Sequence, residues 1–160
     1  MAPFQACVRS PFGTIGVSAT HAHVTGIRYL SPDVAALAPA KNTIAYLACV
    51  QLQAYLDDPA FAFDLPIKLA GTRHQLAVWE AMQAIPAGRT RTYGELAQAI
   101  GSSARAVGGA CGANPIPIVV PCHRVVAAGG ALGGFMGTRE DGFELAIKRW
   151  LLAHEGARPG

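Results

Sequence analysis

The chain of 160 residues is long enough for one domain, or for a small domain joined to a second, with a real hydrophobic core. Hydrophobic residues make up 51% and charged residues 14% of it, against roughly 25% charged in an average domain, which excludes disorder over most of the chain. The net charge of +3 permits a polyanionic partner without demanding one.

Cysteine usage and the N-terminal sequence predict a cytoplasmic protein. The four cysteines, at positions 7, 49, 111 and 122, form no C-x-x-C pair. The first residues have neither the basic start nor the apolar run of a signal peptide, and no apolar stretch approaches the roughly 20 residues of a membrane span. We therefore expect thiols rather than disulfides, and no membrane contact.

No metal site is expected. Cys7, Cys49, His21 and His23 are the conceivable zinc ligands, but only the two histidines are close in sequence. Structural zinc sites usually pair their ligands at short spacing. Satisfied polar groups or surface side chains are the better interpretation.

The first part of the chain predicts a small antiparallel sheet and a helix. Residues 4–30 alternate apolar and polar side chains between glycines, which is typical of two or three short strands. Apolar residues at helical spacing then predict a helix over 33–56, interrupted at Pro39.

A segment containing proline and glycine, residues 58–71, predicts a boundary between two domains. Residues 1–71 are expected to be an N-terminal α/β domain with this connecting segment, and residues 72–160 a C-terminal domain. Because the second domain is expected to be mostly helical, the chain is assigned to the α+β class.

Two capping boxes predict helix starts in the C-terminal domain. Thr72-x-x-Gln75 and Thr92-x-x-Glu95 each place a hydroxyl and a long polar side chain where they can satisfy the first free N–H groups of a helix. Apolar residues at helical spacing follow both boxes, so we expect a helix after each.

The second of these helices and the next one predict a helix-turn-helix. Gly101 is expected to end the former, and Ser102 or Ser103 to cap a third helix running from Ala104 to about Gly112. Alanine and glycine leave this third helix almost without side chains, although each interior glycine costs about 0.8–1 kcal/mol relative to alanine. Close packing on a neighbouring element explains this equally well as entry into the DNA minor groove, which is only about 6 Å wide.

A last helix is predicted from Asp141 to Glu155. Glu144 and Lys148, four residues apart, are expected to pair on its exposed side. Its inward residues are expected at spacings of three and four, namely Phe143, Ile147, Trp150, Leu151 and His154.

Cys122 is the first candidate for chemistry. It lies in Asn114-Pro-Ile-Pro-Ile-Val-Val-Pro-Cys-His-Arg-Val125, where three prolines fix φ and pre-set the backbone. His123 can take the thiol proton only if the chain turns there or a water bridges the two, since neighbours on a strand point to opposite faces. Arg124 would also favour the thiolate. The competing interpretation is a buried cysteine in a core strand.

The motifs around this cysteine resemble the signature of the O6-alkylguanine-DNA alkyltransferases, also called methylated-DNA–protein-cysteine methyltransferases. The resemblance rests on Pro121-Cys-His-Arg-Val125, on Asn114-Pro115 and on Arg105-Ala-Val-Gly-Gly-Ala110. It is dense from about residue 72 to residue 155 and thin before that. The resemblance therefore implies that residues 72–160 are a DNA-binding and alkyl-acceptor domain. Further matching segments are Trp79, Ile85-Pro-Ala-Gly88, Thr92-Tyr-Gly-Glu-Leu-Ala97 and Trp150-Leu-Leu-Ala-His-Glu155.

The resemblance implies direct reversal of DNA damage in a single turnover. A thiolate attacks the alkyl carbon on O6 of guanine, after the base has rotated out of the duplex into a pocket. The alkyl group stays on the cysteine as a thioether, so each molecule acts once, without metal or diffusible cofactor. The implied partner is double-stranded DNA containing O6-alkylguanine, bound by a monomer through the minor groove. Activity on O4-alkylthymine and the preferred alkyl group stay open.

Carried over residue by residue, the resemblance makes Cys122 the alkyl acceptor. His123 would take its proton through a bridging water, and Glu155 would orient and charge that imidazole. Asn114 would hold the turn that presents the cysteine.

The same resemblance implies the substrate contacts. Tyr93 would strain the target phosphate and donate to the flipped base, and Arg105 would fill the gap left in the stack. The carbonyls of Cys122 and Val125 and the N–H of Met136 would read the guanine edge. Further DNA contacts are expected from Thr92, Ala104, Ala106, Gly109 and Arg124.

The sequence departs from the family pattern near the expected pocket. The 101–105 turn is shorter than usual, and the 137–147 segment, where a lid is expected, is longer, with Arg139, Glu140 and Asp141 in it. Met136 replaces a small residue, and His74 stands where bacterial relatives often have Phe. These differences concern specificity and DNA geometry, not the reaction.

Three other functions compete with alkyl transfer. A non-catalytic alkyltransferase-like module would recognise alkylated bases but would lack the cysteine, against which Cys122 argues directly. A cysteine hydrolase would need an oxyanion hole, for which no motif is found. A helix-turn-helix regulator would read bases with Arg, Asn or Gln on its third helix, which offers few side chains.

Overall fold

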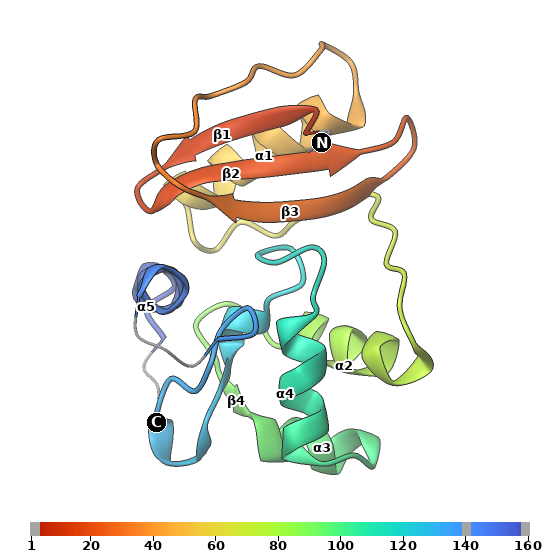
Figure 1. Ribbon diagram of the computed structural model, residues 1–160, viewed down its shortest axis with the longest axis vertical. Coiled ribbons are helices and arrows are strands. Elements are labelled where there is room, and N and C mark those ends of the chain that lie inside the picture. The colour runs from red at the N-terminus through yellow and green to blue at the C-terminus, as the bar shows by residue number, and fades with distance from the viewer. Residues whose placement is uncertain (1–3, 139–141, 158–160) are drawn as a thin grey trace. The chain divides into compact units, whose positions relative to one another are not determined.

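The computed structural model describes residues 4–138 and 142–157, and the chain divides into two compact units, Met1–Leu69 and Ala70–Gly160 (Figure 1). The α+β class expected from the sequence is confirmed, since the first unit contains a three-stranded antiparallel sheet and the second is mostly helical. The division lies close to the boundary predicted after residue 71.

In the first unit, strands β1 (Ala6–Ser10), β2 (Gly13–Ala19) and β3 (Val24–Leu30) form a sheet in that order. Ile15 of the central strand pairs with Val8 on one side and Tyr29 on the other. Helix α1 (Ile44–Asp57) lies along one face of this sheet (Figure 1). Its buried residues Ala48, Leu52 and Tyr55 and the inward residues of β2 make the core, and the predicted strands are confirmed.

The helix predicted over 33–56 is wrong before Ile44. Leu37 and Cys7 instead exchange two backbone hydrogen bonds of 2.9 Å, which extends the chain beside β1. Pro39 has no N–H to continue a helix. The helix starts only at Thr43, whose hydroxyl accepts the N–H of Tyr46.

In the second unit, a two-stranded parallel pair connects the cysteine segment to the helix-turn-helix, because Arg91 pairs with Val125 and Thr92 with Val126. Trp79, Val107, Ile147 and Leu151 are among its fully buried side chains. The elements are α2 (Arg73–Gln83), β4 (Arg91–Thr92), α3 (Tyr93–Ile100), α4 (Ala104–Gly112), η1 (Cys122–Arg124), β5 (Val125–Val126), η2 (Ala128–Gly130) and α5 (Phe143–His154).

The capping signals are confirmed in position and in chemistry. Both capping boxes are formed, with Thr72 accepting the N–H of Gln75 and Thr92 that of Glu95. Gly101 ends α3 in the left-handed conformation at φ 70°. Of the two candidate serines it is Ser103 that caps α4.

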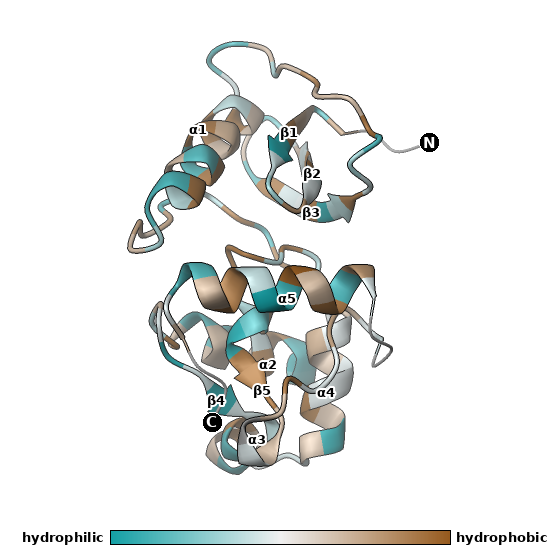
Figure 2. Ribbon diagram, turned by 90° about the vertical axis from the view of Figure 1, so that its left-hand side faces the viewer, coloured by the Kyte–Doolittle hydropathy of each residue, from teal (hydrophilic) through white to brown (hydrophobic). Residues whose placement is uncertain are grey.

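The inward face of α5 differs from the predicted one. Phe143 is 38% exposed, whereas Lys148 is fully buried, so the expected surface pair of Lys148 with Glu144 is wrong. Figure 2 shows apolar and polar residues mixed along this helix. Asp141, the predicted start of the helix, lies outside the described residues, as do Arg139 and Glu140. The buried residues are Leu145, Ile147, Lys148, Leu151 and Leu152.

Two negative findings hold for residues 4–138 and 142–157. None of the helices there has the length and apolar character that crossing a bilayer requires. No group of three or more His, Cys, Asp or Glu side chains comes together there in a way that could hold a metal ion.

Candidate active site

The segment Cys122–Arg124 forms one turn of 3-10 helix instead of continuing as a strand. The Arg124 N–H donates to the Pro121 carbonyl at 3.0 Å, and the Val125 N–H donates to the Cys122 carbonyl. Beyond the turn, Val125 pairs with β4. The chain therefore turns between Cys122 and His123, which is the condition that cooperation between these two neighbours requires.

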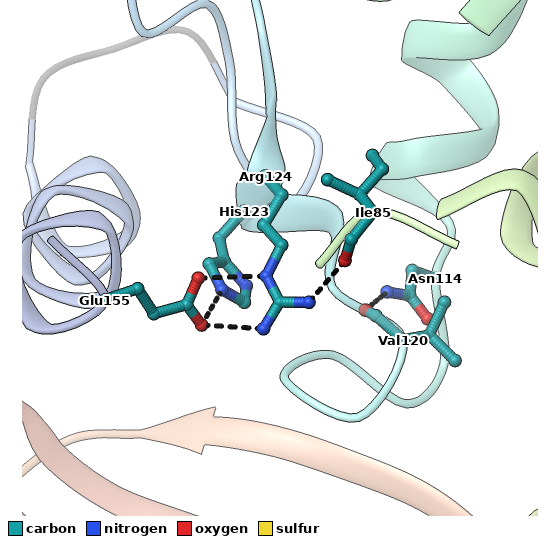
Figure 3. A network of polar contacts seen from close by, with 6 residues as sticks. All are labelled: Ile85, Asn114, Val120, His123, Arg124 and Glu155. Atoms are coloured by element: carbon teal, nitrogen blue, oxygen red, sulfur yellow. Dashed lines mark hydrogen bonds and ion pairs between the residues drawn. The ribbon is translucent and has the colours of Figure 1, made fainter. Parts of the chain in front are cut away.

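Asn114 holds the loop that leads to the cysteine. Its side-chain amide donates to the Val120 carbonyl at 2.8 Å (Figure 3). Its carbonyl oxygen accepts the Ile116 N–H at 3.0 Å. Inside this loop Ile118 has φ 74°, a rare conformation for a β-branched residue. A buried amide that closes the loop and a strained residue within it indicate a backbone held in one shape.

The Cys122 thiol is buried, with 3% of the residue exposed. Burial raises its pKa to about 11, while the Asn114 side chain and the charge of Lys148 act in the opposite direction. Its Sγ donates a weak hydrogen bond to the Met136 sulfur at 3.9 Å. At neutral pH the group is a thiol, so it needs a base before it can act as a nucleophile.

His123 and Glu155 supply such a base and its partner (Figure 3). The imidazole Nε2 lies 2.8 Å from the Glu155 carboxylate, and both side chains are fully buried. Burial lowers the pKa of His123, so the ring is neutral at pH 7. A neutral ring that donates from Nε2 to a carboxylate has an acceptor at Nδ1. That Nδ1 is buried and has no hydrogen-bond partner in the described part of the chain.

Arg124 completes this network from the outside. Its Nε and Nη2 donate to the two Glu155 oxygens at 2.9 Å, and its Nη1 donates to the Ile85 carbonyl at 2.6 Å (Figure 3). The side chain is only 13% exposed. All three guanidinium nitrogens are thus engaged inside the unit, which argues against the predicted DNA contact of Arg124 and gives it the task of holding Glu155.

An open cavity of about 1260 Å³ lies over the cysteine. It brings together six of the predicted site residues: Tyr93, Ala104, Arg105, Gly109, Cys122 and Met136. The other predicted DNA or substrate residues are not among its lining: Thr92 caps α3, Ala106 is exposed on α4, and Val125 is buried in β5. Sequence reasoning did not single out Gly108, Cys111, Gly133, Gly134 and Phe135 as part of this lining.

Tyr93 enters the cavity from the first turn of α3. Its hydroxyl donates to the Gly134 carbonyl at 3.2 Å. Gly133 has φ 71°, and a Cβ there would lie 2.8 Å from the tyrosine ring. Glycine at this position therefore provides both the backbone conformation and the space for the ring.

The glycines of α4 are not explained by packing inside the protein. A Cβ added to Gly108 or Gly109 would meet no atom within 4 Å of the described structure. Gly112 is different, because its Cβ would lie 3.1 Å from the backbone of Gly137. Of the two interpretations offered for this bare helix, close approach to a neighbouring element holds only at its C-terminal end.

Lys148 is a buried residue near the site that the sequence prediction assigned to the exposed face of α5. Its ammonium donates to the carbonyls of Val125, Leu132 and Gly134 at 2.7, 2.6 and 2.9 Å. Burial lowers its pKa to about 8. The signal was present, because Leu145 and Leu152 lie three residues before and four after Lys148, on the same helical face. The Lys148 ammonium thus joins the carbonyls of Leu132 and Gly134 to the carbonyl of Val125, which is predicted to read the guanine edge.

Comparisons with known proteins identify the family of the chain. Residues 73–157 match the family model of the DNA-binding domain of 6-O-methylguanine DNA methyltransferase. A methylated-DNA–protein-cysteine methyltransferase of Mycolicibacterium paratuberculosis is 42% identical over 135 residues, which cover 81% of this chain and 82% of that protein. The chain belongs to this methyltransferase family.

Other members of the methyltransferase family are similar over much of the chain. The Methanosarcina acetivorans protein is 46% identical over 109 residues, covering 67% of this chain and 66% of that one. A crystal structure of Mycobacterium tuberculosis OGT in complex with DNA superposes with a TM-score of 0.79 at 38% identity, covering 94% of this chain and 91% of the other. The resemblance noted in the sequence is confirmed.

Proposed function

We propose that this protein repairs DNA by transferring an alkyl group, in the first place methyl, from O6 of guanine in a duplex to its own Cys122. Membership of the methyltransferase family supports this reading. The observation that carries it is the His123–Glu155 pair, held at 2.8 Å beside a buried thiol that opens onto a cavity. A non-catalytic recognition module would have no use for this thiol and base.

The proton path begins at the Cys122 thiol and ends on His123. A water linking Sγ to Nδ1 would pass the proton to that nitrogen, whose lone pair has no other partner in the described structure. Glu155 then faces an imidazolium across 2.8 Å and stabilises it, and Arg124 keeps the carboxylate in place. This compensates for the burial that otherwise disfavours thiolate.

The transfer itself exchanges one bond for another. The Cys122 sulfur forms a bond to the alkyl carbon while the bond between that carbon and guanine O6 breaks. The electron pair goes to the guanine. The Tyr93 hydroxyl, which donates to the Gly134 carbonyl in the free protein, would turn to donate to the base and steady the developing charge. The product is a thioether, which water does not reverse, so each molecule acts once.

DNA is proposed to lie across α4. The exposed Ala104, Ala106 and Gly109 leave a face from which no bulky side chain projects, suited to the narrow minor groove. Arg105, exposed near the start of α4 and part of the cavity lining, would enter the base stack when the target base rotates into the cavity. The M. tuberculosis relative has been crystallised in complex with DNA. We propose that the protein acts as a monomer.

Intact-mass spectrometry tests the reaction. Mixed with excess duplex carrying one O6-methylguanine, the protein is expected to gain one methyl group and to stop there, because the thioether cannot regenerate. Peptide mapping is expected to place the methyl group on Cys122. The Cys122→Ser variant is the control and is expected to gain nothing.

Each other outcome of this experiment has a definite meaning. An unmodified protein that still binds the damaged duplex would support a recognition module instead. Neither an adduct nor binding would make Cys122 an ordinary core cysteine. Continued release of methylated product without an adduct would indicate a hydrolase.

A further inference from the structure

Met136 occupies an unusual place at the edge of the cavity. The backbones of Phe135 and Thr138 pair with each other at 2.7 and 3.0 Å, so Met136 and Gly137 are the central residues of a tight turn. Their φ values of 51° and 85° are those of a type I′ turn. Glycine, asparagine and aspartate dominate such positions, and methionine has no side-chain group that favours them.

The side chain of Met136 faces the reactive thiol. Its sulfur lies 3.9 Å from the Cys122 sulfur, and both residues line the same cavity. In-line attack on an alkyl carbon needs that carbon within about 3–3.5 Å of the thiolate. The methionine thioether therefore borders the space around the Cys122 sulfur in which the transferred group must lie.

The backbone of the turn cannot easily withdraw. A Cβ on Gly112 would lie 3.1 Å from the N and Cα of Gly137, so the C-terminal end of α4 packs directly against the turn. Phe135, on the other side of Met136, is 4% exposed. Space for a larger group has to come from rotation of the flexible methionine side chain.

We propose that the Met136 side chain sets the size of the alkyl group that Cys122 accepts. This rests on the proposed alkyl transfer and adds a specificity determinant to it. A methyl group fits beside the thioether, whereas a benzyl group requires the methionine to leave its contact with Cys122. The backbone strain at Met136 indicates that the side chain is kept there against the preference of the turn.

Single-turnover rates on two substrates test the proposal. Wild type and Met136→Ala are mixed with duplexes carrying O6-methylguanine or O6-benzylguanine, and alkylated protein is followed by mass spectrometry. The Ala variant is expected to raise the ratio of benzyl to methyl transfer by at least about tenfold, a typical effect of pocket volume. Met136→Leu, which keeps most of the volume, is expected to hold the ratio within about threefold of wild type.

A third variant separates the side chain from the backbone. Met136→Gly removes the side-chain atoms that Met136→Ala removes, takes away Cβ as well, and relieves the positive φ. The two variants are expected to raise the ratio equally. A rise in the Gly variant alone would assign the effect to turn mobility and overturn the proposal, as would an unchanged ratio in the Ala variant. Thermal melting shows whether each variant is folded. If one of the Ala and Gly variants fails to fold, the benzyl-to-methyl ratio of the other one tests the proposal.

A DNA-free measurement adds a second test. The thiol of Cys122 is expected to react faster with the uncharged disulfide 4,4′-dithiodipyridine in Met136→Ala than in wild type, because the thioether no longer covers it. An equal rate would overturn the proposed contact. If wild type takes up no methyl group from DNA, the proposed function itself fails; normal methyl transfer with an unchanged ratio refutes only the role of Met136.

Discussion

At Cys122 the protein combines a reactive role with deep burial. Burial raises the thiol pKa to about 11, so less thiolate is present at any pH below that value than in a free cysteine. The ring of His123, the next residue, is neutral at pH 7 because burial lowers its pKa, so it is available as a base. The free protein is thereby expected to be slow toward soluble electrophiles and to depend on the bound base to bring an alkyl carbon to the sulfur.

A pH profile of thiol alkylation checks this burial. Without DNA, the rate of Cys122 modification by iodoacetamide is expected to rise about tenfold per pH unit from pH 7 to 10, since only the thiolate reacts. Peptide mapping by mass spectrometry reports the rate at this residue alone. In urea-unfolded protein the same profile should level off near the ordinary pKa of about 8.5. Levelling at that pH in the folded protein would contradict the raised pKa.

Glu155 joins two residues that lie next to each other in the cysteine turn. Its carboxylate accepts from His123 at 2.8 Å and from two nitrogens of Arg124 at 2.9 Å. A buried carboxylate with these partners holds the histidine tautomer and compensates the arginine charge. Its loss should therefore affect catalysis and stability together.

Glu155→Gln is expected to slow methyl transfer by on the order of 100-fold, because the imidazolium loses its counter-charge. The free energy of unfolding should fall by about 3 kcal/mol, since Arg124 is left without a carboxylate. Single-turnover kinetics and urea titration measure the two effects. Glu144→Gln, the same change in the first turn of α5, is the matched control and should stay within about 0.5 kcal/mol. Equal behaviour of the two variants would remove Glu155 from the mechanism.

Helix α4 is less stable than an alanine-rich helix would be, because glycines lie along its outer face. Gly108 and Gly109 have free space where a Cβ would stand, so nothing inside the described structure requires glycine there. Alanine would favour the helix at both positions. A smooth surface for an external partner is the remaining explanation, and duplex DNA is the partner that the family relationship supports.

Substitution at Gly109 should therefore separate stability from DNA binding. Gly109→Ala is expected to increase the free energy of unfolding by about 0.5–1 kcal/mol, because alanine loses less conformational entropy than glycine when the helix folds. Gly109→Gln, with a side chain that would fill a narrow groove, is expected to weaken duplex binding at least about tenfold, or about 1.4 kcal/mol. Urea titration and fluorescence anisotropy with a labelled duplex measure the two quantities. Unchanged binding by the Gln variant would mean that DNA does not approach this face.

Helix α5 shows where helical spacing was ambiguous. Leu145 and Leu152 define one face with Lys148, whereas Phe143, Ile147 and Leu151 define a neighbouring one. The sequence prediction took Lys148 to be exposed because it is charged, and so it chose the second face as the buried one. In the structure the lysine donates to three backbone carbonyls and is fully buried. The charge of a residue does not decide its exposure when the fold supplies partners.

At the scale of the whole molecule, the two units contribute different things. The residues that make up the cavity and the His123–Glu155–Arg124 network all lie in Ala70–Gly160. The first unit, with its sheet and α1, has its own core around Ile15, Leu52 and Tyr55. Family similarity extends beyond residues 73–157, since the M. paratuberculosis relative matches 81% of the chain.

What the sequence determined by itself is local chemistry. The capping boxes at Thr72 and Thr92, the left-handed Gly101 and the three strands of the first unit depend on groups within a few residues of one another, so their patterns could be read directly. The motif around Cys122 likewise indicated the family before any geometry was available, and it made this cysteine the predicted alkyl acceptor.

Only the tertiary structure decided which distant groups meet. Lys148 reaches Val125 across 23 positions, through packing that no local pattern encodes. His123 reaches Glu155 across 32 positions, a pair that the family resemblance implied but no local pattern predicts. The same packing engages the Arg124 guanidinium in hydrogen bonds inside the protein and places the Met136 thioether against the Cys122 thiol. The role of each side chain at the site depends on the residues that the folded core brings next to it. Those neighbours cannot be read from the sequence around a single residue.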